Sequence, residues 1–106
     1  MAESSENLCP ASLREQLGEL KDWNLLDSGT VIGKKFTFQD FHQTMAFVNA
    51  VAWIAHSLDH HPDLQVGYRT CSITCSTHRT GGVTSLDLQT AARIDALLSP
   101  NPPSSP

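Results

Sequence analysis

Four of the five histidines in this 106-residue chain fall between residues 56 and 78. Imidazole is the side chain whose unperturbed charge change lies near neutral pH, so a group of histidines can donate and accept protons there. Pro62 directly follows the adjacent pair His60 and His61, and a proline at that point ends a helix and fixes what precedes it. The stretch therefore predicts acid–base chemistry, with four candidate groups: His56, His60, His61 and His78.

Composition predicts one globular domain with a single modest core. Apolar residues make up 40% of the chain, charged residues 17%, and the formal net charge is -4. The seven lysines and arginines are scattered along the sequence, which gives no reason to expect direct nucleic-acid binding. We expect no secretory leader, three reduced cysteines and no membrane contact, because no apolar run approaches the roughly 18 residues of a membrane span. A soluble cytoplasmic protein, with the nucleus as a second location, fits this composition.

Hydrophobic periodicity predicts the first half of the fold. Ser12 and Glu15 have capping-box spacing, and the leucines that follow predict a helix that ends near Asp22. Residues 23–26 and 31–38 are expected to form two strands around a turn. Lys34 interrupts the apolar alternation of the second strand, so its first part is predicted to be an edge or a bulge.

A central helix is predicted from Asp40, which can cap it with Gln43, to about Asp59. Its two neighbouring apolar stripes make a wide apolar surface, which must pack on a sheet and also on another helix or another subunit. Residues 64–69 and 70–77 then read as two strands. In the second of them Cys71, Ile73 and Cys75 share one face.

The last helix is predicted to start at the capping-box pair Thr84 and Asp87 and to run to about Leu98. This places the Asp87 carboxylate at the inward edge of the first turn, where it could reach a histidine. The complete order is α-β-β-α-β-β-α, an α+β fold with a four-stranded antiparallel sheet and three helices packed on one face. We place the domain at residues 10–98, between a flexible segment 1–9 and a disordered Pro/Ser tail 99–106.

The spacing of these residues resembles the signature of the pterin-4a-carbinolamine dehydratase family, over residues 12–98. His56 stands where many members have an acid, Leu64 where animal members commonly have tryptophan, and Thr90 where leucine is common. The matching motifs are His60-His61-Pro62, Tyr68, His78 and Asp87, together with Trp23-Asn24, Phe36-x-Phe38-x-Asp40-Phe41, Gly82-Val83-Thr84 and Ile94-Asp95.

The resemblance implies an enzyme, a hydro-lyase that removes water from a 4a-hydroxy-tetrahydropterin to give a quinonoid dihydropterin and so supports tetrahydrobiopterin recycling. It implies no metal and no cofactor, since the pterin is the substrate, and a homo-tetramer or homo-dimer. In this scheme His60 and His78 move protons at the 4a-hydroxyl, and His61 contacts the ring or shares that work. Asp87, supported by Asp59, orients an imidazole. The implied substrate contacts are His61, Pro62, Tyr68, Ser76 and Thr77.

Three other interpretations stay open at this point. Any one histidine alone is more often a solvated surface group, and Asp87 alone is more often a simple helix-start residue. A zinc site is a second alternative, because His56 and His60 lie four residues apart on a helix and could chelate with His61 or His78. The third is a protein-interaction module, because animal relatives also act as a dimerisation cofactor of a homeodomain transcription factor.

Overall fold

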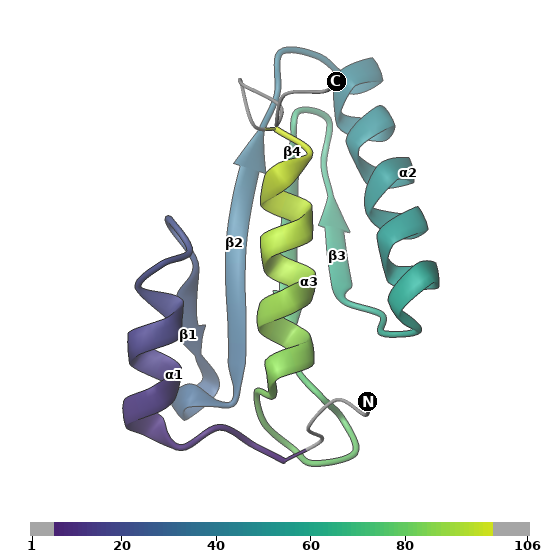
Figure 1. The fold of residues 1–106 in the computed structure, drawn as a ribbon. Coiled ribbons are helices and arrows are strands. Elements are labelled where there is room, and N and C mark those ends of the chain that lie inside the picture. The colour runs from purple at the N-terminus through teal and green to yellow at the C-terminus, as the bar shows by residue number, and fades with distance from the viewer. Residues whose placement is uncertain (1–5, 99–106) are drawn as a thin grey trace, which may run out of the picture.

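The chain folds as a four-stranded antiparallel sheet in the order β1-β2-β4-β3, with three helices on one of its faces (Figure 1). This computed structural model describes residues 6–98. The predicted α+β class and element order are confirmed, whereas most of the predicted N-terminal segment and the whole Pro/Ser tail lie outside the described residues. The elements are α1 Pro10–Leu17, β1 Asn24–Leu26, the 3₁₀ turn η1 Asp27–Gly29, β2 Val31–Thr37, α2 Phe41–Leu58, β3 Asp63–Val66, β4 Thr70–Cys75 and α3 Ser85–Ala96.

The core lies between the two central strands and the helices. β4 pairs along its whole length with residues 32–37 of β2, with Ile32 opposite Cys75 and Phe36 opposite Cys71. The inward-facing side chains of β4 are fully buried, as the alternation of Cys71, Ile73 and Cys75 predicted. The opposite face of the sheet carries mainly polar side chains, with Leu26 and Val31 at one edge, and no helix covers it (Figure 1).

The predicted edge or bulge at Lys34 is wrong, because β2 is a regular inner strand. Lys34 lies on the helix-covered face, where its Nζ is 3.0 Å from Asp95 Oδ1 and 4.8 Å from the centre of the Phe36 ring. Trp23 Nε1 donates to the same carboxylate at 3.1 Å. A lysine can occupy this half-buried position because α3 supplies a matching charge.

The predicted Ser12–Glu15 capping box is also wrong. α1 starts at Pro10, where the missing N–H of proline costs no helical hydrogen bond. Ser12 therefore lies inside the helix, and its hydroxyl accepts from Gln16 Nε2 at 2.9 Å. The helix ends at Leu17, before the predicted end near Asp22.

α2 begins as predicted, because Asp40 Oδ1 accepts the backbone N–H of Gln43 at 2.8 Å. It ends at Leu58, and Asp59 adopts a left-handed conformation with φ 52° and ψ 41°. One side of the helix packs into the core, whereas Trp53 on another side is 70% exposed. The wide apolar surface is thus covered only in part. None of the helices in the described part of the chain has the length and apolar character needed to cross a membrane.

Candidate active site

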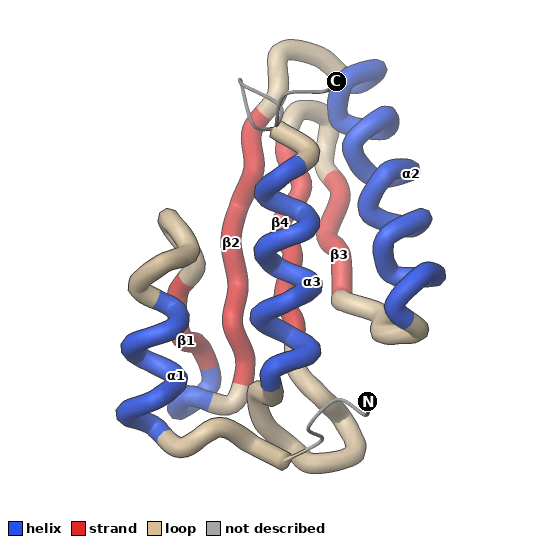
Figure 2. Tube along the Cα trace, in the orientation of Figure 1, coloured by secondary structure: helices blue, strands red, loops and turns tan. Residues whose placement is uncertain are grey.

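The site lies at one end of the sheet, where two loops lie (Figure 2). One loop, residues 59–62, joins α2 to β3, and the other, residues 76–84, joins β4 to α3. β3 and β4 are antiparallel, so the start of β3 lies beside the end of β4. The two loops and the start of β3 line an open pocket of about 370 Å³. Its lining residues are Asp59, His60, His61, Pro62, Asp63, Thr77, His78 and Arg79.

The centre of the site is a contact between His60 and Asp87. His60 Nε2 is 2.5 Å from Oδ1 of the fully buried Asp87, so the predicted approach of this carboxylate to a histidine is present in the structure. A carboxylate only accepts hydrogen bonds, so Nε2 of His60 carries the hydrogen. When the ring is neutral, the unprotonated nitrogen is therefore Nδ1, which is left to exchange protons with a ligand.

The second oxygen of Asp87 is held by Thr84, which caps α3, and by Thr77, which follows β4. Oδ2 accepts the Thr84 backbone N–H at 2.9 Å, which completes the predicted capping box. Oδ2 also accepts the Thr77 hydroxyl at 2.8 Å. Because Thr77 uses its hydrogen there, the Thr84 hydroxyl is left to donate to Thr77 Oγ1, also at 2.8 Å. These bonds fix the carboxylate, and the carboxylate in turn fixes the ring of His60.

Neighbouring residues His60 and His61 have different environments because the chain turns sharply at Asp59. Asp59 is the left-handed residue that ends α2, and His60 N–H then donates to Ala55 O at 3.1 Å. The His60 side chain is only 11% exposed, whereas His61 is exposed. His78 is exposed too and reaches the same pocket from the other loop. The site therefore combines one fixed imidazole with two accessible ones.

Several predicted site residues lie elsewhere. Tyr68 lies in the turn between β3 and β4, at the far end of the sheet, where its ring stacks on Phe41 with centres 5.9 Å apart. Ser76 is not among the residues that line the pocket. His56 is exposed on α2, with its ring 6.0 Å from that of Trp53. Within one chain the structure brings none of these three residues to His60.

The zinc alternative gains no support from the geometry. Within residues 6–98, no three His, Cys, Asp or Glu side chains are arranged so that they could hold a metal ion. His60 already uses Nε2 in the contact with Asp87.

A cysteine nucleophile is also disfavoured in this part of the fold. Burial, together with the negative charges of Asp87 and Asp63, raises the pKa of the Cys75 thiol to about 12. Burial likewise raises the pKa of Cys71. The thiolate is the reactive form of cysteine, so both buried thiols are unreactive at neutral pH.

Sequence reasoning did not single out Asp63 or Arg79, although both line the pocket. Both could have been found from the sequence, because each lies next to a residue that was already predicted to belong to the site. Asp63 directly follows Pro62, and Arg79 directly follows His78.

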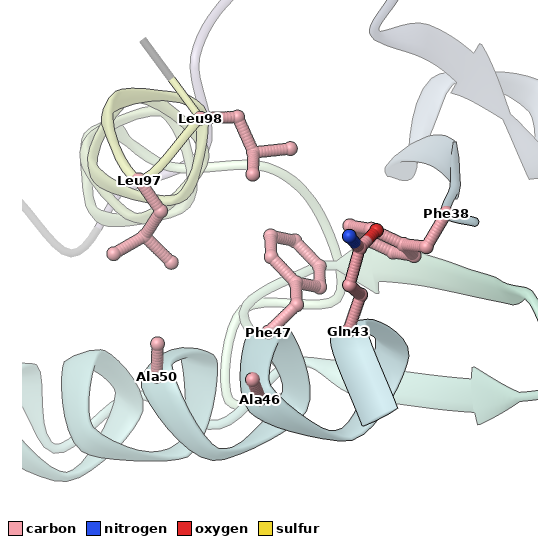
Figure 3. Close-up of a pocket in the computed structure, with 7 residues that line it drawn as sticks. All are labelled: Phe38, Gln43, Ala46, Phe47, Ala50, Leu97 and Leu98. Atoms are coloured by element: carbon pink, nitrogen blue, oxygen red, sulfur yellow. The ribbon is translucent and has the colours of Figure 1, made fainter. Parts of the chain in front are cut away.

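A second hollow, of about 340 Å³, lies between α2 and the end of α3 (Figure 3). Phe47 points from α2 toward this space, and Leu97 and Leu98 border it from the end of α3 (Figure 3). None of its lining residues is titratable, so it cannot supply acid–base groups. Its lining is Phe38, Gln43, Ala46, Phe47, Ala50, Leu97 and Leu98.

Comparison with known proteins identifies the family of this chain. The family model described as pterin 4 alpha carbinolamine dehydratase matches residues 6–97, which is nearly the whole described chain. The chain belongs to this family. A dehydratase-family protein of Nitrosospira multiformis is 47% identical over 90 residues, covering 85% of this chain and 78% of the relative. One from Legionella pneumophila strain Corby is 43% identical over 101 residues, covering 91% and 89%. Both relatives carry the name pterin-4-alpha-carbinolamine dehydratase provisionally.

Two solved structures share the dehydratase fold. A protein from Brucella melitensis, described as a transcriptional coactivator/pterin dehydratase, superposes with a TM-score of 0.85 at 32% identity, covering 89% of this chain and all of that one. A pterin dehydratase-like protein described as a RuBisCO assembly factor in the alpha-carboxysome gives a TM-score of 0.66 at 26% identity, covering 76% and 93%. Proteins on this fold are thus described both as dehydratases and by roles in assembly or transcription.

Proposed function

We propose that this protein is a 4a-hydroxytetrahydropterin dehydratase, a lyase that removes water from the 4a-carbinolamine and returns a quinonoid dihydropterin for recycling. The observation that carries the proposal is the His60–Asp87 contact at the wall of a pocket that His61 and His78 also line. Family membership supplies the reaction class. The proposed place of action is the cytoplasm, with the nucleus as a second location.

The proposed reaction is an elimination that needs two proton transfers. The hydroxyl at C4a must gain a proton to leave as water, and a ring nitrogen of the pterin must lose one. His60 exchanges its proton at Nδ1, because Nε2 is held by Asp87. His78 is the partner for the second transfer, and His61 contacts the ring or shares this work. Each well-placed acid or base contributes about 10²-fold to 10⁴-fold in rate.

No step of this proposal uses a metal or a cofactor, since the pterin itself is the substrate. Asp87 acts through His60, as a residue that positions the imidazole. Asp59 and Pro62 act on the backbone, by setting the direction in which the histidine pair leaves α2.

The proposal is tested by the rate at which the purified protein accelerates the decay of 4a-hydroxytetrahydropterin absorbance. We expect His60→Ala to lower kcat/KM by about 10²-fold or more. The matched control is His42→Ala, which removes an exposed histidine near the other end of α2. Circular dichroism verifies that both variants fold. Absence of acceleration by the wild type, or full activity in a folded His60→Ala variant, would contradict the proposal.

A second candidate function is protein interaction, in particular as a dimerisation cofactor of a transcription factor. It is favoured by the exposed Trp53 on α2. The apolar hollow between α2 and the end of α3 is a second uncovered apolar surface (Figure 3). An exposed aromatic side chain of this size is typical of contact surfaces. The description of the Brucella protein as a coactivator as well as a dehydratase is consistent with such a role.

The two functions make different predictions for one pair of variants. If a partner docks on α2, the Trp53→Ala variant should no longer bind that partner but should still catalyse dehydration. Loss of dehydration in His60→Ala would leave docking intact. Recovery of a transcription factor by the wild type, with no dehydration of any 4a-hydroxypterin, would favour the interaction function alone.

A further inference from the structure

We infer that Arg79 selects pterins whose side chain carries an anionic group, either a carboxylate or a phosphate. The inference rests on the proposed function and adds a substrate class to the same pocket. Neither the acid–base scheme nor the fold uses this arginine.

The position of Arg79 follows from its loop. The loop is closed by hydrogen bonds from Thr77 N–H to Gly82 O at 2.8 Å and from Gly81 N–H to Thr77 O at 2.9 Å. The side-chain amide of Asn7 donates to Thr80 O at 3.0 Å and holds the same loop from the N-terminal segment. Arg79 thus projects from a fixed backbone at the wall of the histidine pocket.

The charge of Arg79 is available to a ligand. The ion pairs found within residues 6–98 are Lys34–Asp95 and His60–Asp87, and Arg79 takes part in neither. Arg79 is also the one lysine or arginine among the residues that line this pocket. An exposed guanidinium at the wall of a small-molecule pocket can therefore pair with an anionic ligand group.

The other charged groups of the pocket restrict where that anion can lie. Asp59 and Asp63 line the same pocket, and their carboxylates repel an anionic substituent. The favoured position is therefore beside Arg79, on the loop that also carries His78. The pterin ring is uncharged and its proton transfers are assigned to the histidines. The guanidinium is thus left for a group outside the ring.

Arginine suits both candidate anions. Its planar fork forms paired hydrogen bonds with a carboxylate or a phosphate, and it stays charged at every physiological pH. Preference for an anionic pterin should consequently weaken as salt is raised, since the contact is exposed to solvent.

Isothermal titration with stable oxidised pterins tests the inference directly. The neutral probe is 6-hydroxymethylpterin, and the two anionic probes are its phosphate ester and pterin-6-carboxylate. We expect the wild type to bind at least one anionic probe about five-fold to ten-fold more tightly than the neutral one. Arg79→Gln should abolish this preference, and Arg79→Lys should retain part of it. Arg93→Gln, which removes an exposed arginine on α3, is the control of equal charge change and should keep the preference.

The outcomes separate this inference from the proposed function. Equal binding of neutral and anionic probes by the wild type, or an unchanged preference in Arg79→Gln, overturns the role of Arg79. A preference for one anionic probe alone identifies phosphate or carboxylate as the recognised group. Dehydration of 4a-hydroxypterins without any such preference overturns only the inference. Preference without dehydration overturns the proposed reaction and leaves Arg79 as a binding determinant. Failure of all three probes to bind overturns the role of Arg79, and the dehydration assay then decides the proposed function independently.

Discussion

Asp87 uses each of its two carboxylate oxygens for a different neighbour. Oδ1 holds His60, and Oδ2 accepts the backbone of Thr84 and the hydroxyl of Thr77. The spacing of Thr84 and Asp87 predicted a carboxylate in the first turn of α3, facing inward. The identity of its partner was not predictable, because the choice between His60 and His78 depends on the left-handed turn at Asp59.

We predict that Asp87→Ala lowers the free energy of unfolding by about 2–4 kcal/mol, because it removes a helix cap and leaves buried donors without an acceptor. Urea denaturation followed by circular dichroism measures the loss. Glu15→Ala, an exposed acid on α1, should change stability by less than about 0.5 kcal/mol. A folded Asp87→Ala protein with an unchanged pH profile and rate of dehydration would show that Asp87 has no orienting role.

Cys75 makes a prediction about pH. Its pKa in the folded protein is about 12, against an ordinary value of 9.0. Between these values the folded chain binds more protons than the unfolded chain, so the free energy of unfolding must fall as pH rises through this window. Denaturation at pH 8 and pH 10 measures the effect. The decrease should be smaller in Cys75→Ala, and an equal decrease in both proteins would assign it to other groups.

At the scale of elements, the long periodic segments were predictable and the local exceptions were not. α2, β4 and the start of α3 have clear caps or clean alternation, and the structure follows them. Lys34 misled the prediction because a charge on the inner face of a strand is acceptable only if another element supplies a counter-charge. That counter-charge, Asp95, lies 61 residues away in the sequence. The predicted start of α1 was wrong because the helix begins at Pro10, which places Ser12 inside the first turn and not at the cap.

The Lys34–Asp95 pair joins β2 to α3, and Trp23 ties the segment before β1 to the same carboxylate. We predict that Asp95→Ala lowers the free energy of unfolding by about 1–3 kcal/mol, since it leaves a half-buried ammonium and an indole N–H without an acceptor.

Lys34→Met, which keeps the apolar stem, should cost less. The double variant should lose less stability than the sum of the two single losses, because the single variants each break the same interaction. A double-mutant cycle based on urea denaturation measures this difference. Strict additivity would show that the two side chains do not interact in solution.

At the scale of the molecule, the exposed side of α2 bears on assembly. Trp53 is 70% exposed in the single chain, and a large exposed aromatic is costly unless something covers it. We therefore predict a homo-tetramer or homo-dimer in light scattering coupled to gel filtration, with Trp53→Glu shifted to lower mass.

Gln16→Glu on α1 adds the same charge at another exposed position and should leave the mass unchanged. A monomeric wild type would contradict the predicted oligomer and would leave Trp53 free for a different partner.

The contact between His60 and Asp87 joins residues 27 positions apart, one in the loop after α2 and the other in the first turn of α3. Neither α2, which precedes His60, nor α3, which carries Asp87, holds a complete site by itself. During refolding, the fixed imidazole can therefore form only after α3 has docked beside the end of α2. The recovery of activity after dilution from denaturant should follow that docking step in time, and it should lag behind any helical signal that arises earlier.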